Sequence, residues 1–230
     1  MLLWTSLEGS AGGGPSPPTT PLLVLDFVNG IYQVNGADFT LADVIDKPSF
    51  VTGGSLQLRF ANETTRGSGV PNVIGDALAA LVPNPAGTFV LDWEELSGTF
   101  TGIPFSVQDG AGDPDAVTQL LQFQRSGGGD GSGVYVLEDD GSDFRDVNLL
   151  ALSGLGRRQL AMTVASTKMI GSVDGQSTIA SGFVGSVDPT CDTASFGSLS
   201  GDWLFDELNI LRLILYPERP DSDLPSLSAL

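Results

Sequence analysis

Three acidic side chains lie close together in the segment Asp92-Trp93-Glu94-Glu95. If this segment is a β-strand, Asp92 and Glu94 project from one face, because successive side chains of a strand point to opposite faces. Two neighbouring carboxyl groups can cleave a glycosidic bond, one as the acid and the other as the base or nucleophile. The alternative is an acidic strand end that is exposed to solvent.

Two groups of aspartates lie in expected loops, where their oxygen atoms can serve as metal ligands. The first group is Asp139, Asp140 and Asp143, and the second is Asp109, Asp113 and Asp115. Calcium takes roughly six to eight oxygen ligands, which clustered aspartates supply. Neither loop has the spacing of an EF-hand, so solvated turns are the alternative. We expect no other cofactor.

Aromatic side chains offer a third kind of site, a platform on which a sugar ring can stack. The aromatic residues in strand-like segments include Trp93, Tyr135, Trp203 and Tyr216. Trp93 and Tyr135 are the candidates for contact with a glycan. Burial in a hydrophobic core is the alternative for all four side chains.

The charge balance excludes several functions. The 230 residues contain 28 Asp and Glu against 10 Lys and Arg and no His, a net charge of −18. Such a surface repels phosphate backbones and anionic lipids, so we expect neither nucleic-acid binding nor membrane binding. With Cys191 as the single cysteine and no histidine, the chain cannot form a Ser-His-Asp triad, a Cys-His pair or a zinc finger. We therefore expect no enzymatic activity and assign no catalytic residue.

The N-terminal residues read as an arm attached to one folded domain. Residues 8–21 are rich in Gly, Pro, Ser and Thr, which is typical of an extended linker. The tip before the linker is apolar and carries Leu2, Leu3, Trp4 and Leu7. One interpretation is an anchoring arm that buries this tip in a neighbouring subunit, and the other is a frayed terminus. The predicted domains are thus an arm at 1–21 and a β-sandwich at 22–230.

Short apolar runs separated by turn signals predict an all-β fold. The expected strands are 22–28, 31–34, 55–60, 88–93, 99–107, 117–123, 133–137, 147–152, 159–164 and 169–173. Regular short strands with Gly-rich and Asp-rich turns between them are typical of an antiparallel sandwich or a barrel, and we expect the sandwich. The run 203–216 fits a helix or a strand, and we favour a strand because Gly201 and Pro217 bracket it. Short helices are expected at 76–82 and 222–230.

The C-terminal half resembles concanavalin A-like, laminin-G-like modules. The resemblance is carried by the strand 159–164, the segment Lys168 to Gly175 with its Ser-Val-Asp-Gly turn, and the ending Leu208 to Pro217. The tail 221–227 resembles the closing helix of these modules, with Pro225 as an interruption. The resemblance implies a jelly roll of two curved antiparallel sheets. Some proteins of this fold are glucanases, but residues 92–95 depart from the Glu-x-Asp-x-x-Glu pattern of those enzymes, which favours an exposed acidic strand end.

The opening of the domain is similar to bacteriophage virion proteins that carry such modules. The matching residues are Leu25-Asp26-Phe27, Gly30, Tyr32, Gly36 and the segment 39–44. This resemblance implies a virion structural protein, a head-decoration, fibre-base or tail-associated module. Such a protein is assembled in the host cytoplasm, in many copies or as a homo-oligomer, and binds other virion subunits. The alternative is a module that binds a host-surface glycan, and a glycan hydrolase is the weakest reading.

Overall fold

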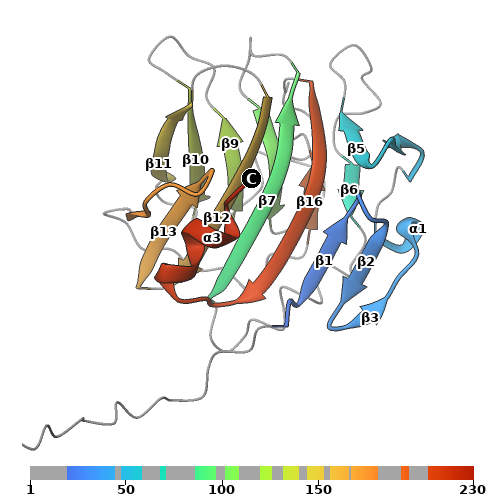
Figure 1. The fold of residues 1–230 in the computed structure, drawn as a ribbon, viewed down its shortest axis with the longest axis horizontal. Helices are drawn as coiled ribbons and strands as arrows, with labels where there is room; N and C mark the ends of the chain where they lie inside the picture. The colour runs from blue at the N-terminus through green and yellow to red at the C-terminus, as the bar shows by residue number, and fades with distance from the viewer. Residues whose placement is uncertain are drawn as a thin grey trace, which may run out of the picture.

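The computed structural model describes residues 20–44, 48–58, 68–70, 86–96, 102–108, 120–125, 132–139, 144–152, 156–165, 167–180, 193–196 and 207–230. Within these ranges the strands form two antiparallel sheets that face each other, and the helices are short (Figure 1). The prediction of an all-β antiparallel sandwich is confirmed. Residues 1–19 lie outside the described ranges, so the arm with Leu2, Leu3, Trp4 and Leu7 stays a prediction, as does the domain boundary at residue 22.

The larger sheet has ten strands. Its main order is β14 (Ile179–Ala180), β13 (Lys168–Val173), β12 (Gly156–Ala165), β7 (Gly87–Glu95), β16 (Leu208–Pro217), β1 (Leu23–Asp26), β2 (Ile31–Val34) and β3 (Ala37–Asp38). The start of β16 also pairs with β5 (Ser55–Leu58), which in turn pairs with β4 (Val51–Thr52). The two longest strands of this sheet, β12 and β16, flank β7 and so place it at the centre.

The smaller sheet has six strands and lies behind the larger one in Figure 1. Its order is β11 (Phe144–Leu152), β10 (Ser132–Asp139), β9 (Leu120–Arg125), β8 (Gly102–Gln108), β15 (Thr193–Phe196) and β6 (Ser68–Val70). The short strands β3, β4, β6, β14 and β15 are not among the strands expected from the sequence.

The hydrophobic core lies between the two sheets. Phe89 and Phe27 of the larger sheet region meet Phe105 and Phe196 of the smaller sheet, and all four are almost fully buried. The Phe105 and Phe196 ring centroids are 5.3 Å apart, close enough for a favourable tilted contact. Along β7, alternate residues such as Leu91 join this core, so the residues between them face outward from the sandwich.

Strand β16 contains a bulge that changes which residues face the core. Its register against β7 shifts between Ile210 and Arg212. Ile210 is buried before the bulge and Leu213 after it, so Arg212 is left on the outer face. The backbone N–H of Phe27 donates to the carbonyl of Leu211 at this point, where β16 changes its neighbour from β5 to β1.

Helices are few in the described part of the chain. The first is α1 (Leu41–Val44), followed by the 3-10 turn η1 (Pro48–Phe50). A second 3-10 turn, η4 (Asp221–Asp223), leads into α3 (Leu224–Leu227). The closing helix predicted at 222–230 is thus confirmed in a shorter form. Pro225 lies in the first turn of α3, where its missing N–H is not needed, and so does not interrupt the helix.

Part of the ambiguous run 203–216 is a strand, as favoured from the sequence, because β16 covers its residues from Leu208 onward. The rest of that run and the helix predicted at 76–82 lie outside the described residues.

Candidate functional site

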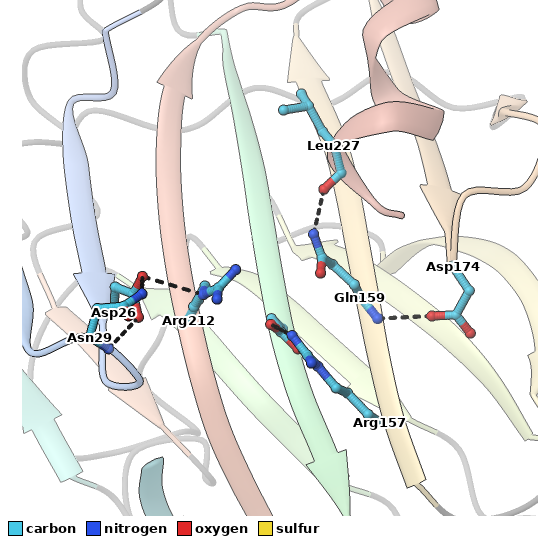
Figure 2. Close-up of polar contacts among 8 residues, drawn as sticks. Asp26, Asn29, Arg157, Gln159, Asp174, Arg212 and Leu227 are labelled. Carbon is cyan, nitrogen blue, oxygen red and sulfur yellow. Dashed lines mark hydrogen bonds and ion pairs between the residues drawn. The ribbon is translucent and has the colours of Figure 1, made fainter. Parts of the chain in front are cut away.

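A row of polar side chains crosses the outer face of the ten-stranded sheet. Asp26 on β1 is the register partner of Arg212 on β16, Arg212 is the partner of Asp92 on β7, and Asp92 is the partner of Gln159 on β12. We call these four residues the polar row. Figure 2 labels Asp26, Arg212 and Gln159 of this row, together with Arg157. Neighbouring strands lie about 4.8 Å apart, so the row spans four adjacent strands on one face of the sheet.

Asp92 and Arg157 form a two-pronged ion pair. The Nε of Arg157 donates to Oδ1 of Asp92 at 2.8 Å, and Nη2 donates to Oδ2 at 2.6 Å. The Asp92 side chain is fully buried, whereas 44% of the Arg157 side chain is exposed. The hydrogen bond to Asp92 is the largest cause of a raised pKa at Arg157; the charges of Asp92 and Glu94 add to it, and burial opposes it. The guanidinium therefore neutralises Asp92 and covers it from solvent.

The acidic pair predicted at Asp92 and Glu94 does share one strand face. However, Asp92 is buried in its ion pair, so the favoured interpretation of an exposed acidic strand end is wrong at this residue. Glu94 is held as well, because its Oε2 accepts a hydrogen bond of 2.8 Å from Nδ2 of Asn209. Glu95 is buried on the core side. An acid–base pair for glycoside cleavage needs carboxyl groups that can reach a substrate, and Asp92 cannot.

Arg212 is the least satisfied charged group of the row. Its Nε lies 3.4 Å from Oδ2 of Asp26, and one third of its side chain is exposed. Within the described residues, its two terminal nitrogens make no hydrogen bond, and Nε makes no contact beyond this ion pair. A guanidinium has five N–H donors in a planar fork that suits a carboxylate. Arg212 thus offers donors to a ligand on this face.

Asp26 is fixed from its other side by the turn that follows β1. Its Oδ1 accepts from the backbone N–H of Asn29 at 3.0 Å, and its Oδ2 accepts from Nδ2 of Asn29 at 2.7 Å. This is the local hydrogen bonding by which Asp stabilises a turn. Burial, and then the charge of Asp26, raises the pKa of Tyr32 on the neighbouring strand. Asp26 therefore holds Arg212 in position on the outer face.

The two ends of the polar row differ in character. Beyond Asp26 lies its register partner Ile31, which is 42% exposed, and Val28 in the preceding turn is 46% exposed. At the other end, Nε2 of Gln159 donates to the carbonyl of Leu227 in α3 at 2.7 Å, and its backbone N–H donates to Asp174. Helix α3 covers the outer face over β12 and β13 (Figure 1). One end of the polar row is therefore next to exposed apolar side chains, and the other end contacts helix α3.

Of the four aromatic residues considered, Tyr216 is the one that the structure describes on this outer face, where it packs against the cluster that contains Val90 and Leu224. Trp93 is 1% exposed in the core, and its Nε1 donates to Oε1 of Glu95 at 3.3 Å, so the prediction that Trp93 contacts a glycan is wrong. The alternation of β7 is the reason, because Trp93 shares the inward face with Phe89 and Leu91. The backbone of Tyr135 lies in β10, but its side chain, like Trp203, is outside what the structure describes.

The predicted calcium loops also fall outside the described residues. Only the backbone of Asp139, the last residue of β10, is described; Asp140, Asp143 and the group Asp109, Asp113 and Asp115 are not. Among the residues that are described, no three acidic, Cys or His side chains cluster as metal ligands would. Calcium binding stays a prediction. A separate finding is that none of the described helices is long and apolar enough to cross a membrane.

Arg212, Asp26 and Arg157 were not singled out from the sequence. The sequence does contain a feature that could have indicated Arg212 and Asp26, because each is a single charged residue inside an apolar segment that is predicted to be a strand. A charge in such a run marks a position that is either paired or turned away from the core. Their proximity to Asp92 depends on strand pairing between residues far apart in the chain.

Comparisons with known proteins show the fold. No protein-family model matches the chain, and no curated protein matches it. The CBM40 domain of the Ruminococcus gnavus IT-sialidase has a TM-score of 0.57 at 15% sequence identity, covering 76% of this chain and 96% of that one. The same domain bound to α2,3-sialyllactose has a TM-score of 0.54 at 17% identity, covering 67% and 88%.

A third similar structure comes from a different enzyme. Domain 4 of AbnA, a GH43 extracellular arabinanase from Geobacillus stearothermophilus, in complex with arabinotriose, has a TM-score of 0.52 at 16% identity, covering 70% of this chain and 72% of that one. The neighbours named here are carbohydrate-binding β-sandwich domains and not catalytic domains. At this identity the likeness concerns the fold.

Proposed function

We propose that this chain is a carbohydrate-binding module that binds its glycan at the polar row, with Arg212 as the central contact. The observation that carries the proposal is the guanidinium of Arg212, which is one third exposed and whose terminal nitrogens are unpaired among the described residues. Sugar hydroxyls and carboxylates accept hydrogen bonds from guanidinium N–H groups, and Arg212 supplies such donors on this face. Arg157, by contrast, has Nε and Nη2 engaged by Asp92.

The similar structures support this class of function. One is bound to sialyllactose, which carries a carboxylate, and another to arabinotriose, which does not. A guanidinium binds a carboxylate through two parallel N–H···O hydrogen bonds, and this interaction is stronger than its hydrogen bond to a hydroxyl group. The preferred ligand of this chain is therefore an acidic sugar whose carboxylate is bound by Arg212.

The virion structural role was the first reading of the sequence. It rests on the opening of the domain and on the arm, and residues 1–19 of that arm lie outside the described residues. The neighbours named above are carbohydrate-binding domains, so they favour the alternative reading of a glycan-binding module. Partner virion subunits, assembly in many copies and a location in a virion stay predictions from the sequence.

The test is a calorimetric titration of the full chain with α2,3-sialyllactose and, separately, with arabinotriose. We expect sialyllactose to bind more tightly than arabinotriose. Arg212→Ala should weaken the binding of sialyllactose about 10- to 100-fold, which corresponds to the free energy of a hydrogen bond to a charged group. Lys168→Ala is the matched control, because Lys168 is a cation already bound to Glu218 and Asp221. It should leave binding unchanged.

The outcomes separate the parts of the proposal. Absence of binding to either sugar contradicts the proposed glycan-binding function. Equal binding by the wild type and Arg212→Ala contradicts the placement of the site at the polar row. Tighter binding of arabinotriose contradicts the preference for an acidic sugar.

A further inference from the structure

The chain contains two Asn-Gly pairs in one hairpin region, Asn29-Gly30 and Asn35-Gly36. Both asparagines are exposed, and both glycines have a positive φ, +68° and +78°. Around each glycine the space that a Cβ would occupy is open. The backbone nitrogen that follows an asparagine can attack its side-chain carbonyl carbon, and a glycine at that position gives the least steric hindrance. From the sequence alone, the two asparagines are equally susceptible.

The structure separates the two asparagines by their hydrogen bonds. Asn29 is tied to Asp26 twice, through its backbone N–H at 3.0 Å and through its side-chain amide at 2.7 Å. Its amide must leave Asp26 before the carbonyl carbon can turn toward the nitrogen of Gly30. Asp26 is in turn held by Arg212, so the restraint on Asn29 is part of the candidate site.

Asn35 has no such restraint. Its backbone N–H donates to the carbonyl of Leu22 at 2.7 Å, but among the described residues its side-chain amide makes no hydrogen bond, and neither does the N–H of Gly36. Asn35 has a φ of +50°, the left-handed conformation that asparagine adopts in a two-residue Asn-Gly hairpin turn. Both the attacked group and the attacking nitrogen are therefore open to solvent.

We propose that Asn35 is a site of spontaneous deamidation and that Asp26 protects Asn29 from the same reaction. The nitrogen of Gly36 gives up its proton and attacks Cγ of Asn35, so a C–N bond forms while the bond from Cγ to Nδ2 breaks and ammonia leaves. Water then opens the cyclic imide at either carbonyl and yields aspartate or isoaspartate. No oxidant or reductant takes part.

The product changes the hairpin between β2 and β3. Each reaction adds one negative charge, and isoaspartate also adds one methylene to the backbone of a two-residue turn. The register pairs Val34 with Ala37 and Gln33 with Asp38 lie directly beside this turn. A longer turn is incompatible with that register, because loop length sets strand pairing in a hairpin.

The test is incubation of the folded full chain at mildly alkaline pH, followed by peptide mapping and measurement of isoaspartate at both asparagines. Asn29 should react about tenfold more slowly than Asn35, the factor that corresponds to breaking one hydrogen bond of about 1.4 kcal/mol. In the urea-unfolded chain the two rates should become equal. Equal rates in the folded chain, a faster Asn29, or no reaction at Asn35 would each overturn the proposal.

A pair of variants tests the protective role of Asp26. Asp26→Ala should raise the rate at Asn29 to that of Asn35 and leave Asn35 unaffected. Asp38→Ala is the matched control, because Asp38 is a carboxylate of the same hairpin that binds Gln33 and no asparagine. It should change neither rate. An unchanged Asn29 in Asp26→Ala, with the sheets intact by circular dichroism, contradicts the role of Asp26.

Discussion

Removing Arg157 should destabilise the fold more than removing its partner Asp92. Arg157→Ala leaves a carboxylate whose side chain is fully buried without its two hydrogen bonds. Asp92→Ala leaves a guanidinium that is already 44% exposed and can be hydrated. The asymmetry follows because the group left behind determines the cost, and a buried unpaired charge is far more costly than a hydrated one.

The size of each effect can be worked from these exposures. Loss of one partner from a fully buried ion pair costs about 3–5 kcal/mol. Because Arg157 covers Asp92 from the solvent side, water enters when it is removed, and we expect Arg157→Ala to lower the free energy of unfolding by about 2–3 kcal/mol. Asp92→Ala should lower it by about 1–2 kcal/mol, since only hydrogen bonds to a solvated group are lost.

The assay is urea unfolding followed by circular dichroism, with both single variants and the double variant in one thermodynamic cycle. Arg212→Ala is the control, because the contact that Arg212 makes within the described residues is the 3.4 Å ion pair with Asp26, and its loss should cost no more than about 1 kcal/mol. A loss for Asp92→Ala that exceeds the loss for Arg157→Ala would refute the reasoning. So would an Arg157→Ala variant as stable as the wild type.

Two more predictions concern the closing helix and alkaline pH. Ser228 is fully buried and its hydroxyl lies 2.8 Å from that of Ser172, so Ser228→Ala should lower the free energy of unfolding by about 1–3 kcal/mol, whereas the exposed Ser226→Ala should change it little. Urea unfolding checks both variants, and equal losses would contradict the role of the buried pair. Burial and the charge of Asp26 raise the pKa of Tyr32, so the unfolded chain loses this proton first. The contribution of Tyr32 to the free energy of unfolding is therefore fully present below about pH 10, and it is lost as the pH rises through the pKa of Tyr32 in the folded protein. Tyr32→Phe should lose stability less steeply than the wild type above that pH, and parallel pH profiles would contradict the assignment.

Much of the fold can be predicted from local pattern. The strands β2 and β7 lie where the sequence places them, because alternation of apolar residues and Asn-Gly turns act over a few residues. The same alternation carries the information that Trp93 faces the core with Phe89 and Leu91. Residue type makes Trp93 a candidate for a glycan contact, but its strand face places it in the core, which is the alternative that the sequence also offers.

The polar row could not be predicted in the same way, because it is made by pairing between distant strands. Asp26, Asp92 and Arg212 come from opposite parts of the chain, and only the register of β1, β16 and β7 brings them together. The position of Arg212 depends in addition on the bulge in β16. Simple alternation from Leu208 and Ile210 would turn Arg212 into the core.

The sequence by itself determined the class of the protein: a turn-rich chain of short alternating strands buries its apolar faces in an all-β sandwich or barrel. The tertiary structure decided which charges meet. It buried Asp92 under Arg157, turned Arg212 outward through one extra residue in β16, and tied Asn29 but not Asn35. These outcomes depend on strand register, and a shift of one residue moves every side chain of a strand to the opposite face.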